Sequence, residues 1–103
     1  MVGGYKVVTL CGSTKFKEQF LKAQKELTLD GYIVLSVGLF GHSGGIISEK
    51  QKIMLDDMHK RKIDMADEIF VINVDGYIGN STKSEIKYAI KTGKGVAYLH
   101  PID

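Results

Sequence analysis

The sequence predicts a single α/β domain built on an open, parallel sheet of four strands. Four short runs rich in Val, Ile and Tyr alternate with segments whose apolar residues recur every three or four positions. The apolar runs are nearly continuous, which is typical of parallel strands covered on both faces. This β-α-β-α-β-α-β order implies right-handed crossovers and a three-layer arrangement with helices on both faces.

Length, composition and charge agree with this prediction. The 103 residues have room for one domain, and 44% hydrophobic with 25% charged residues is ordinary for a folded protein. The net charge of +2 is spread along the chain, so we expect no nucleic-acid partner. No apolar run approaches the roughly 20 residues that span a bilayer, so we expect no membrane segment. One cysteine and no signal-peptide pattern lead us to expect a cytoplasmic protein.

In chain order, the first strand is expected at residues 5–10 and the second at 32–37. The helix between them has Phe16, Phe20, Ala23 and Leu27 at helical spacing, and Gly31 is its stop signal. The second helix is expected at residues 48–65. Ser48 and Gln51 fit a capping box there, and Ile47, Met54, Met58 and Met65 share one face.

The third strand is expected at residues 68–74 and the fourth at 96–99. The helix between them has Ile86, Ala89 and Ile90 on one face and ends at Gly93. The favoured strand order is 2-1-3-4, as in Rossmann-like or flavodoxin-like folds. The loops leaving strands 1 and 3 then flank a crevice where ligands of such sheets bind.

The first of these loops carries Cys11-Gly12-Ser13-Thr14 before a helix. It lacks the glycine and lysine pattern of a Walker loop and the G-x-G-x-x-G of a dinucleotide site. A cysteine phosphatase loop would need an arginine where Lys17 stands, and Cys11 is better explained as a small buried residue. Ser13 or Thr14 is predicted to cap the helix, to contact a ligand, or both.

The loop after strand 3 leads to Glu85, which has two explanations. Thr82-Lys83-Ser84-Glu85 fits a capping box, and spacing alone favours that structural role. However, a carboxylate in the first helical turn, facing the crevice opposite Ser13, is also where a polar ligand would sit.

Three motifs resemble the nucleoside 2-deoxyribosyltransferase family, which includes 2'-deoxynucleoside 5'-monophosphate N-glycosidases. They are C-G-S after a strand, the strand A-D-E-I-F-V-I-N-V, and the helix start G-x-S-T-x-x-E-I-x-Y-A. The likeness runs from Val7 to Leu99. It implies that Glu85 attacks the anomeric carbon of a deoxyribose, forms a covalent glycosyl-enzyme, and passes the sugar to water or another base. We expect the helix N-terminus to keep Glu85 ionised at neutral pH.

The chain departs from the family at two positions. His59 and Gly79 stand where the family carries aspartates, the first of which assists proton transfer to the leaving base. His59 either takes over that role, for which a near-neutral pKa is suited, or is an exposed structural histidine. Asp56 and Asp57 are alternative proton donors.

The resemblance implies a small-molecule nucleoside or nucleotide as substrate and a homo-oligomer that closes the shallow crevice. Asp75 is expected either to orient a ribose hydroxyl or to form a turn, and Tyr77 to stack on a base or close the rim. His42, in the glycine-rich segment 38–45, is a possible phosphate or base contact. We expect no cofactor and no metal, since no cluster has the spacing of a closed metal site. Catalytic roles are assigned to Glu85 and His59, and substrate contacts to Cys11, Gly12, Ser13, Asp75, Gly79 and Ser81.

Two other functions remain open from the sequence. A non-catalytic nucleotide-binding module would keep the crevice without acid catalysis, as His59 and Gly79 suggest. A phosphoacceptor receiver domain shares the architecture, but it needs acids at the end of strand 1, where this chain has Cys11-Gly12.

Overall fold

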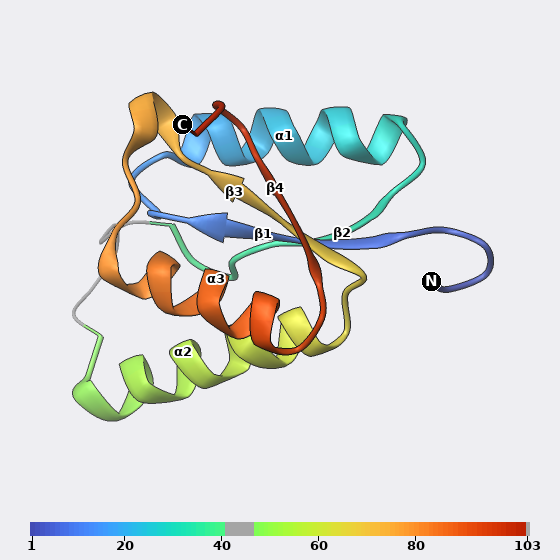
Figure 1. Cartoon of the computed structure of the whole chain (residues 1–103). Coiled ribbons are helices and arrows are strands. Elements are labelled where there is room, and N and C mark those ends of the chain that lie inside the picture. Colours follow the sequence, from blue (N-terminus) through green and yellow to red (C-terminus); the bar gives the residue numbers. More distant parts are fainter. Residues whose placement is uncertain (41–46, 103) are drawn as a thin grey trace.

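The four strands form one parallel sheet in the order β2-β1-β3-β4, which confirms the prediction (Figure 1). The computed structural model describes residues 1–40 and 47–102. Its strands are β1 (Val7–Gly12), β2 (Ile33–Leu35), β3 (Glu68–Ile72) and β4 (Gly95–Tyr98). Its helices are α1 (Lys17–Leu29), α2 (Glu49–Asp64) and α3 (Asn80–Lys91), with a 3-10 turn, η1, at Val74–Gly76. None of these helices is long and apolar enough to cross a membrane.

The sheet is the middle of three layers, with α1 on one face and α2 and α3 on the other (Figure 1). Successive side chains of a strand point to opposite faces. Leu10 therefore packs with Phe20 and Ala23 of α1, whereas the next residue, Cys11, packs with Ile63 of α2 and Ala89 of α3. This alternation directs the only cysteine toward the layer that also holds the candidate catalytic residues.

The first strand and helix begin later than the sequence predicts. Tyr5 is exposed and pairs with Val2 in an isolated bridge, and β1 continues to Gly12 instead. Helix α1 begins at Lys17, and its N-cap, Phe16, makes no side-chain capping bond. The predicted capping role of Ser13 or Thr14 is therefore wrong, because both residues lie in the loop before the helix.

One of the two predicted capping boxes forms. The Ser48 hydroxyl accepts a hydrogen bond from the Gln51 backbone N–H at 3.1 Å, and the Gln51 side chain accepts one from Ser48 N–H at 3.0 Å. Helix α3, however, begins at Asn80 after an N-cap at Gly79. Glu85 is consequently in the second turn, and the capping explanation for it is wrong.

Helix α2 buries a different face from the one its methionines suggest. His59 and Ile63, one turn apart, are its buried residues. Met54 and Met65 are 49% and 66% exposed, and Ile47 and Met58 are also exposed. The predicted apolar stripe thus faces away from the core, and an otherwise polar face carrying His59 packs toward the sheet.

Candidate active site

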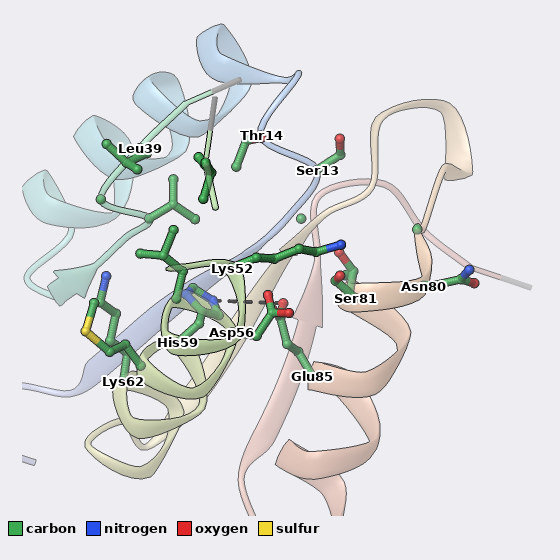
Figure 2. A pocket seen from close by; sticks show the side chains of 18 of the residues that line it. Ser13, Thr14, Leu39, Lys52, Asp56, His59, Lys62, Asn80, Ser81 and Glu85 are labelled. Atoms are coloured by element: carbon green, nitrogen blue, oxygen red, sulfur yellow. Dashed lines mark ion pairs between the residues drawn. The ribbon is translucent and has the colours of Figure 1, made fainter. Parts of the chain in front are cut away.

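A cavity of about 1020 Å³ lies at the carboxyl ends of β1 and β3, where the strand order reverses. This is the position at which open α/β sheets bind ligands. Its wall combines the loops after β1 and β2 with one face of α2 and the start of α3 (Figure 2). The volume is at the upper end of the range of small-molecule sites and has room for a nucleotide.

Gly12 allows the β1 loop to pass close to β3 beside this cavity. Its φ of +153° is one that side-chain-bearing residues rarely adopt, and a Cβ there would lie 2.9 Å from the Ile72 carbonyl oxygen. The close approach brings the loop that carries Ser13 and Thr14 next to the segment leading to α3.

Glu85 is the carboxylate at the floor of the cavity (Figure 2). Only 12% of its side chain is exposed. Burial raises the pKa of Glu85 to about 7, Asp56 adds to the rise, and a hydrogen bond from the Cys11 thiol opposes it. Glu85 is therefore only partly ionised at neutral pH, whereas the sequence predicted an ionised carboxylate, because burial disfavours the charge.

His59 of α2 lies against Glu85. Its Nε2 atom is 3.9 Å from Glu85 Oε1 and 3.4 Å from Cys11 Sγ. Burial, with Lys62 next in size, lowers the pKa of His59 to about 4 against the opposing effects of the Leu10 backbone and Asp56. The ring is therefore neutral at pH 7. Both earlier expectations for His59, a near-neutral pKa and an exposed structural position, are wrong.

Cys11 lies directly beneath these two side chains. It is fully buried in β1 and is not part of the cavity wall. Burial, reinforced by Glu85, raises the pKa of Cys11, so the sulfur is a thiol. Its single S–H can donate either to Glu85 or to His59. One ligand atom from each of Cys11, His59 and Glu85 lies within 4.8 Å of the others.

The remaining predicted site residues divide into two groups. Gly12, Ser13, Gly79 and Ser81 all line the cavity. Asp75 does not. It occupies η1 with a positive φ of 52°, and its N–H donates to His100 Nδ1 at 3.0 Å. Asp75 therefore has the turn-forming role that the sequence allowed, and His42 lies outside the described residues.

Several residues of the wall were not predicted. Lys52 extends from α2 over the cavity, and Asn80 stands at the start of α3 (Figure 2). Lys52 is seven residues, or two helical turns, before His59, so the two share a face of α2. This spacing could have predicted that Lys52 lines the cavity. Asp56 lines the cavity, whereas Asp57 lies on the outer face near Arg61.

Tyr77 forms part of the rim of the cavity. Its ring packs edge-on against Phe16 with centroids 5.9 Å apart, and Lys15 Nζ lies 3.7 Å from the ring centroid. Tyr77 is nevertheless 47% exposed. One face of the Tyr77 ring is thus already in contact with the Lys15 cation. The side chain lies at the rim of the cavity, which is one of the two positions that the sequence predicted for it.

Comparisons of the sequence with protein-family models and with curated proteins give no match. The assignment of function therefore depends on the residues of the cavity and on the resemblance of the three sequence motifs.

Proposed function

We propose that this protein cleaves or transfers at the N-glycosidic bond of a nucleoside or nucleotide, with Glu85 as the nucleophile. The observation that carries the proposal is the position of the Glu85 carboxyl group in the wall of the cavity. Ser81, one turn earlier on α3, lines the same cavity, and Ser13 approaches it from the β1 loop. A sugar bound between the two serines would present its anomeric carbon to Glu85.

The reaction proceeds in two displacements. A carboxylate oxygen of Glu85 attacks C1' as the bond from C1' to the base nitrogen breaks, and the base leaves with that electron pair and takes up a proton. Water or a second base then attacks C1' and releases the Glu85 carboxylate. Two inversions at C1' retain the configuration of the sugar. Neither step requires a cofactor.

In this scheme the leaving base takes its proton from water, because Asp56 acts on Glu85 as a negative charge. His59 is neutral at pH 7 and thus has no imidazolium proton to give. Asp56 lines the cavity one turn before His59, whereas Asp57 is on the outer face. His59 is then a positioning residue, which contacts Glu85 and Cys11 and excludes water from beneath the carboxylate. Lys52 supplies positive charge that suits an anionic substrate such as a nucleoside monophosphate.

Release of free base from deoxynucleosides and their 5'-monophosphates, followed by chromatography, tests the proposal. We expect base release by the native protein and a loss of at least about 1,000-fold in Glu85→Gln, which removes the nucleophile but keeps the shape of the side chain. Asp57→Asn, on the outer face of the same helix, is the matched control and should retain activity. Base release that persists in Glu85→Gln would refute the assignment.

A second candidate is a nucleotide-binding module without catalytic activity. The buried, uncharged His59 favours it, because the family's proton-transfer position then holds no acid. Calorimetric titration with nucleotides distinguishes the two. Saturable binding that is unchanged by Glu85→Gln, together with no release of base, would support the module.

We also propose that the protein works as a homo-oligomer in the cytoplasm, as the sequence predicts. The exposed stripe of Ile47, Met54, Met58 and Met65, which runs along α2 and just past both of its ends, supports the assembly. Ile47 and Met58 also line the cavity, so a second copy packed on this stripe would cover the edge of the site.

A further inference from the structure

Three elements that are distant in sequence bring a thiol, an imidazole and a carboxylate together beside the cavity. Cys11 comes from β1, His59 from α2 and Glu85 from α3. The atoms that face one another are Cys11 Sγ, His59 Nε2 and a Glu85 oxygen, and they all lie within 4.8 Å of each other. Sulfur, imidazole nitrogen and carboxylate oxygen are the three donor types that bind zinc in proteins.

The separations suit a tetrahedral ion. Zinc bonds of about 2.0 to 2.3 Å at tetrahedral angles place neighbouring ligand atoms roughly 3.3 to 3.6 Å apart. Cys11 Sγ and His59 Nε2 are 3.4 Å apart, and His59 Nε2 and Glu85 Oε1 are 3.9 Å apart. The third pair, Cys11 Sγ and a Glu85 oxygen, lies within 4.8 Å.

The surroundings also suit a divalent cation. A thiolate and a carboxylate balance its two positive charges, which offsets the cost of burying the ion. The charged neighbours that act on His59 and Glu85 are one acid, Asp56, and two bases, Lys60 and Lys62. The backbone of Leu10 also acts on His59, in the direction that favours a proton on the ring.

Three protein ligands leave one position of the tetrahedron open. Because His59 and Glu85 line the cavity above the fully buried Cys11, that position faces the cavity, through which an ion or water can reach it. This is the arrangement of zinc sites that exchange a ligand, as opposed to closed structural sites.

We propose that Cys11, His59 and Glu85 form a binding site for Zn²⁺ or a similar thiophilic divalent cation at the floor of the cavity. The site does not depend on the proposed glycosyl transfer. Bound zinc inhibits the proposed glycosyl transfer, because the ion occupies the carboxylate oxygens that would attack the sugar.

The first test is spectroscopic and uses the tag-free protein after treatment with a chelator. Titration with Co²⁺ should give one equivalent of bound ion with a near-ultraviolet thiolate-to-cobalt band and the strong visible bands of tetrahedral coordination. Cys11→Ser should lose the near-ultraviolet band. Cobalt bands of octahedral type, or a thiolate band that persists in Cys11→Ser, would refute the site.

The second test measures zinc affinity by competition with a chromophoric chelator. Glu85→Gln and His59→Gln should each weaken binding by at least ~100-fold, more than the loss of an outer hydrogen-bond partner. Glu49→Gln, at the edge of the same cavity, and His100→Gln, outside it, are matched controls that should bind as the native protein does. Excess Mg²⁺ should not compete, since it prefers oxygen ligands. Equal zinc affinity in Glu85→Gln and Glu49→Gln would overturn the proposal, and circular dichroism checks that each variant is folded.

Discussion

Glu85 and His59 are two ionisable side chains whose charged forms are disfavoured by burial. Desolvation disfavours whichever form carries charge, so it raises the pKa of the acid and lowers the pKa of the base. The result is a pKa of about 7 for Glu85 and about 4 for His59. A carboxylic acid that titrates near neutral pH inside a cavity is typical of a functional group.

The pH dependence of catalysis should follow Glu85. The nucleophile must be ionised, so kcat/KM for base release should rise about tenfold per pH unit below pH 7 and level off above it. The measurement is a pH profile of the chelator-treated protein with a deoxynucleoside monophosphate. A rising limb centred near 4.5, the ordinary pKa of a glutamate, would contradict the burial of the catalytic carboxylate.

Glu85 should also make the folded protein less stable as the pH rises. Its folded-state pKa lies above the unfolded value of 4.5, so its contribution to stability is full below 4.5 and is lost as the pH passes through 7. Since one pKa unit corresponds to about 1.4 kcal/mol, Glu85→Gln should be more stable than the native protein by up to about 3 kcal/mol at high pH. At a pH below 4.5 the two should be equally stable.

Urea unfolding of the two proteins at low and high pH is the measurement. Glu49→Gln, an exposed acid, is the control and should match the native protein throughout. The effect of His59 on the pH dependence of stability has the opposite sign, because its folded-state pKa lies below the unfolded value of 6.5. Its contribution to stability is therefore lost as the pH falls from 6.5 through 4. A difference between Glu85→Gln and the native protein that is independent of pH would contradict the pKa of Glu85.

Single residues were predicted best where a local pattern fixed them. Ser13 directly follows β1, Gly79 is the N-cap of α3 and Ser81 lies in its first turn, and all three line the cavity. Asp75 also follows a strand, but the chain turns there, so it lies outside the cavity wall. The burial of His59 depends on which face of α2 packs against the sheet. The methionines on the opposite face led to the wrong prediction of the buried face.

The helix boundaries show where local signals suffice and where they compete. Ser48 and Gln51 form their predicted box at the start of α2. At α3, the extended backbone of Gly79 starts the helix three residues before Thr82, so Thr82 becomes a buried helical residue. This earlier start turns Glu85 from a capping residue into one that faces the cavity.

Removal of the α2 capping box should destabilise the protein. Ser48→Ala removes the hydroxyl that accepts the Gln51 N–H, which costs about 1 kcal/mol for a typical N-cap. Ser84→Ala, which removes an exposed hydroxyl from α3, is the matched control and should change stability by less than about 0.5 kcal/mol. Urea unfolding compares the two variants. Equal stability of both would contradict the role of the cap.

The order of the whole sheet could be predicted because the connections are short and their handedness is restricted. The alternation of strands and helices predicts a parallel sheet. Because successive strands are added on opposite sides of β1, the order of the sheet reverses there, and the cavity lies between the loops after β1 and β3. The cluster of Cys11, His59 and Glu85 could not be predicted from spacing. Its members lie 48 and 26 residues apart, as their numbers show, and only the packing of α2 and α3 on one face of the sheet brings them together.

The exposed stripe on α2 predicts the assembly state. Met54→Glu places a charge in the centre of the stripe and should shift a homo-oligomer to the monomer, because burying an unpaired carboxylate is costly. Leu29→Glu is the control, since Leu29 is exposed at the end of α1 on the other face of the sheet. Light scattering coupled to size-exclusion chromatography gives the mass of each. A native protein that is already monomeric would contradict the proposed assembly.

The most direct test of the proposed function is to trap the sugar on the protein. Chelator-treated protein is incubated with a 2'-fluoro-2'-deoxynucleoside or its 5'-monophosphate, analogues whose glycosyl-enzyme is hydrolysed slowly, and its intact mass is measured before peptide mapping. We predict a gain of one fluorinated sugar, located on Glu85 and missing from Glu85→Gln. Base release by the native protein with Glu85 unmodified, or with the sugar on another residue, would contradict the proposal.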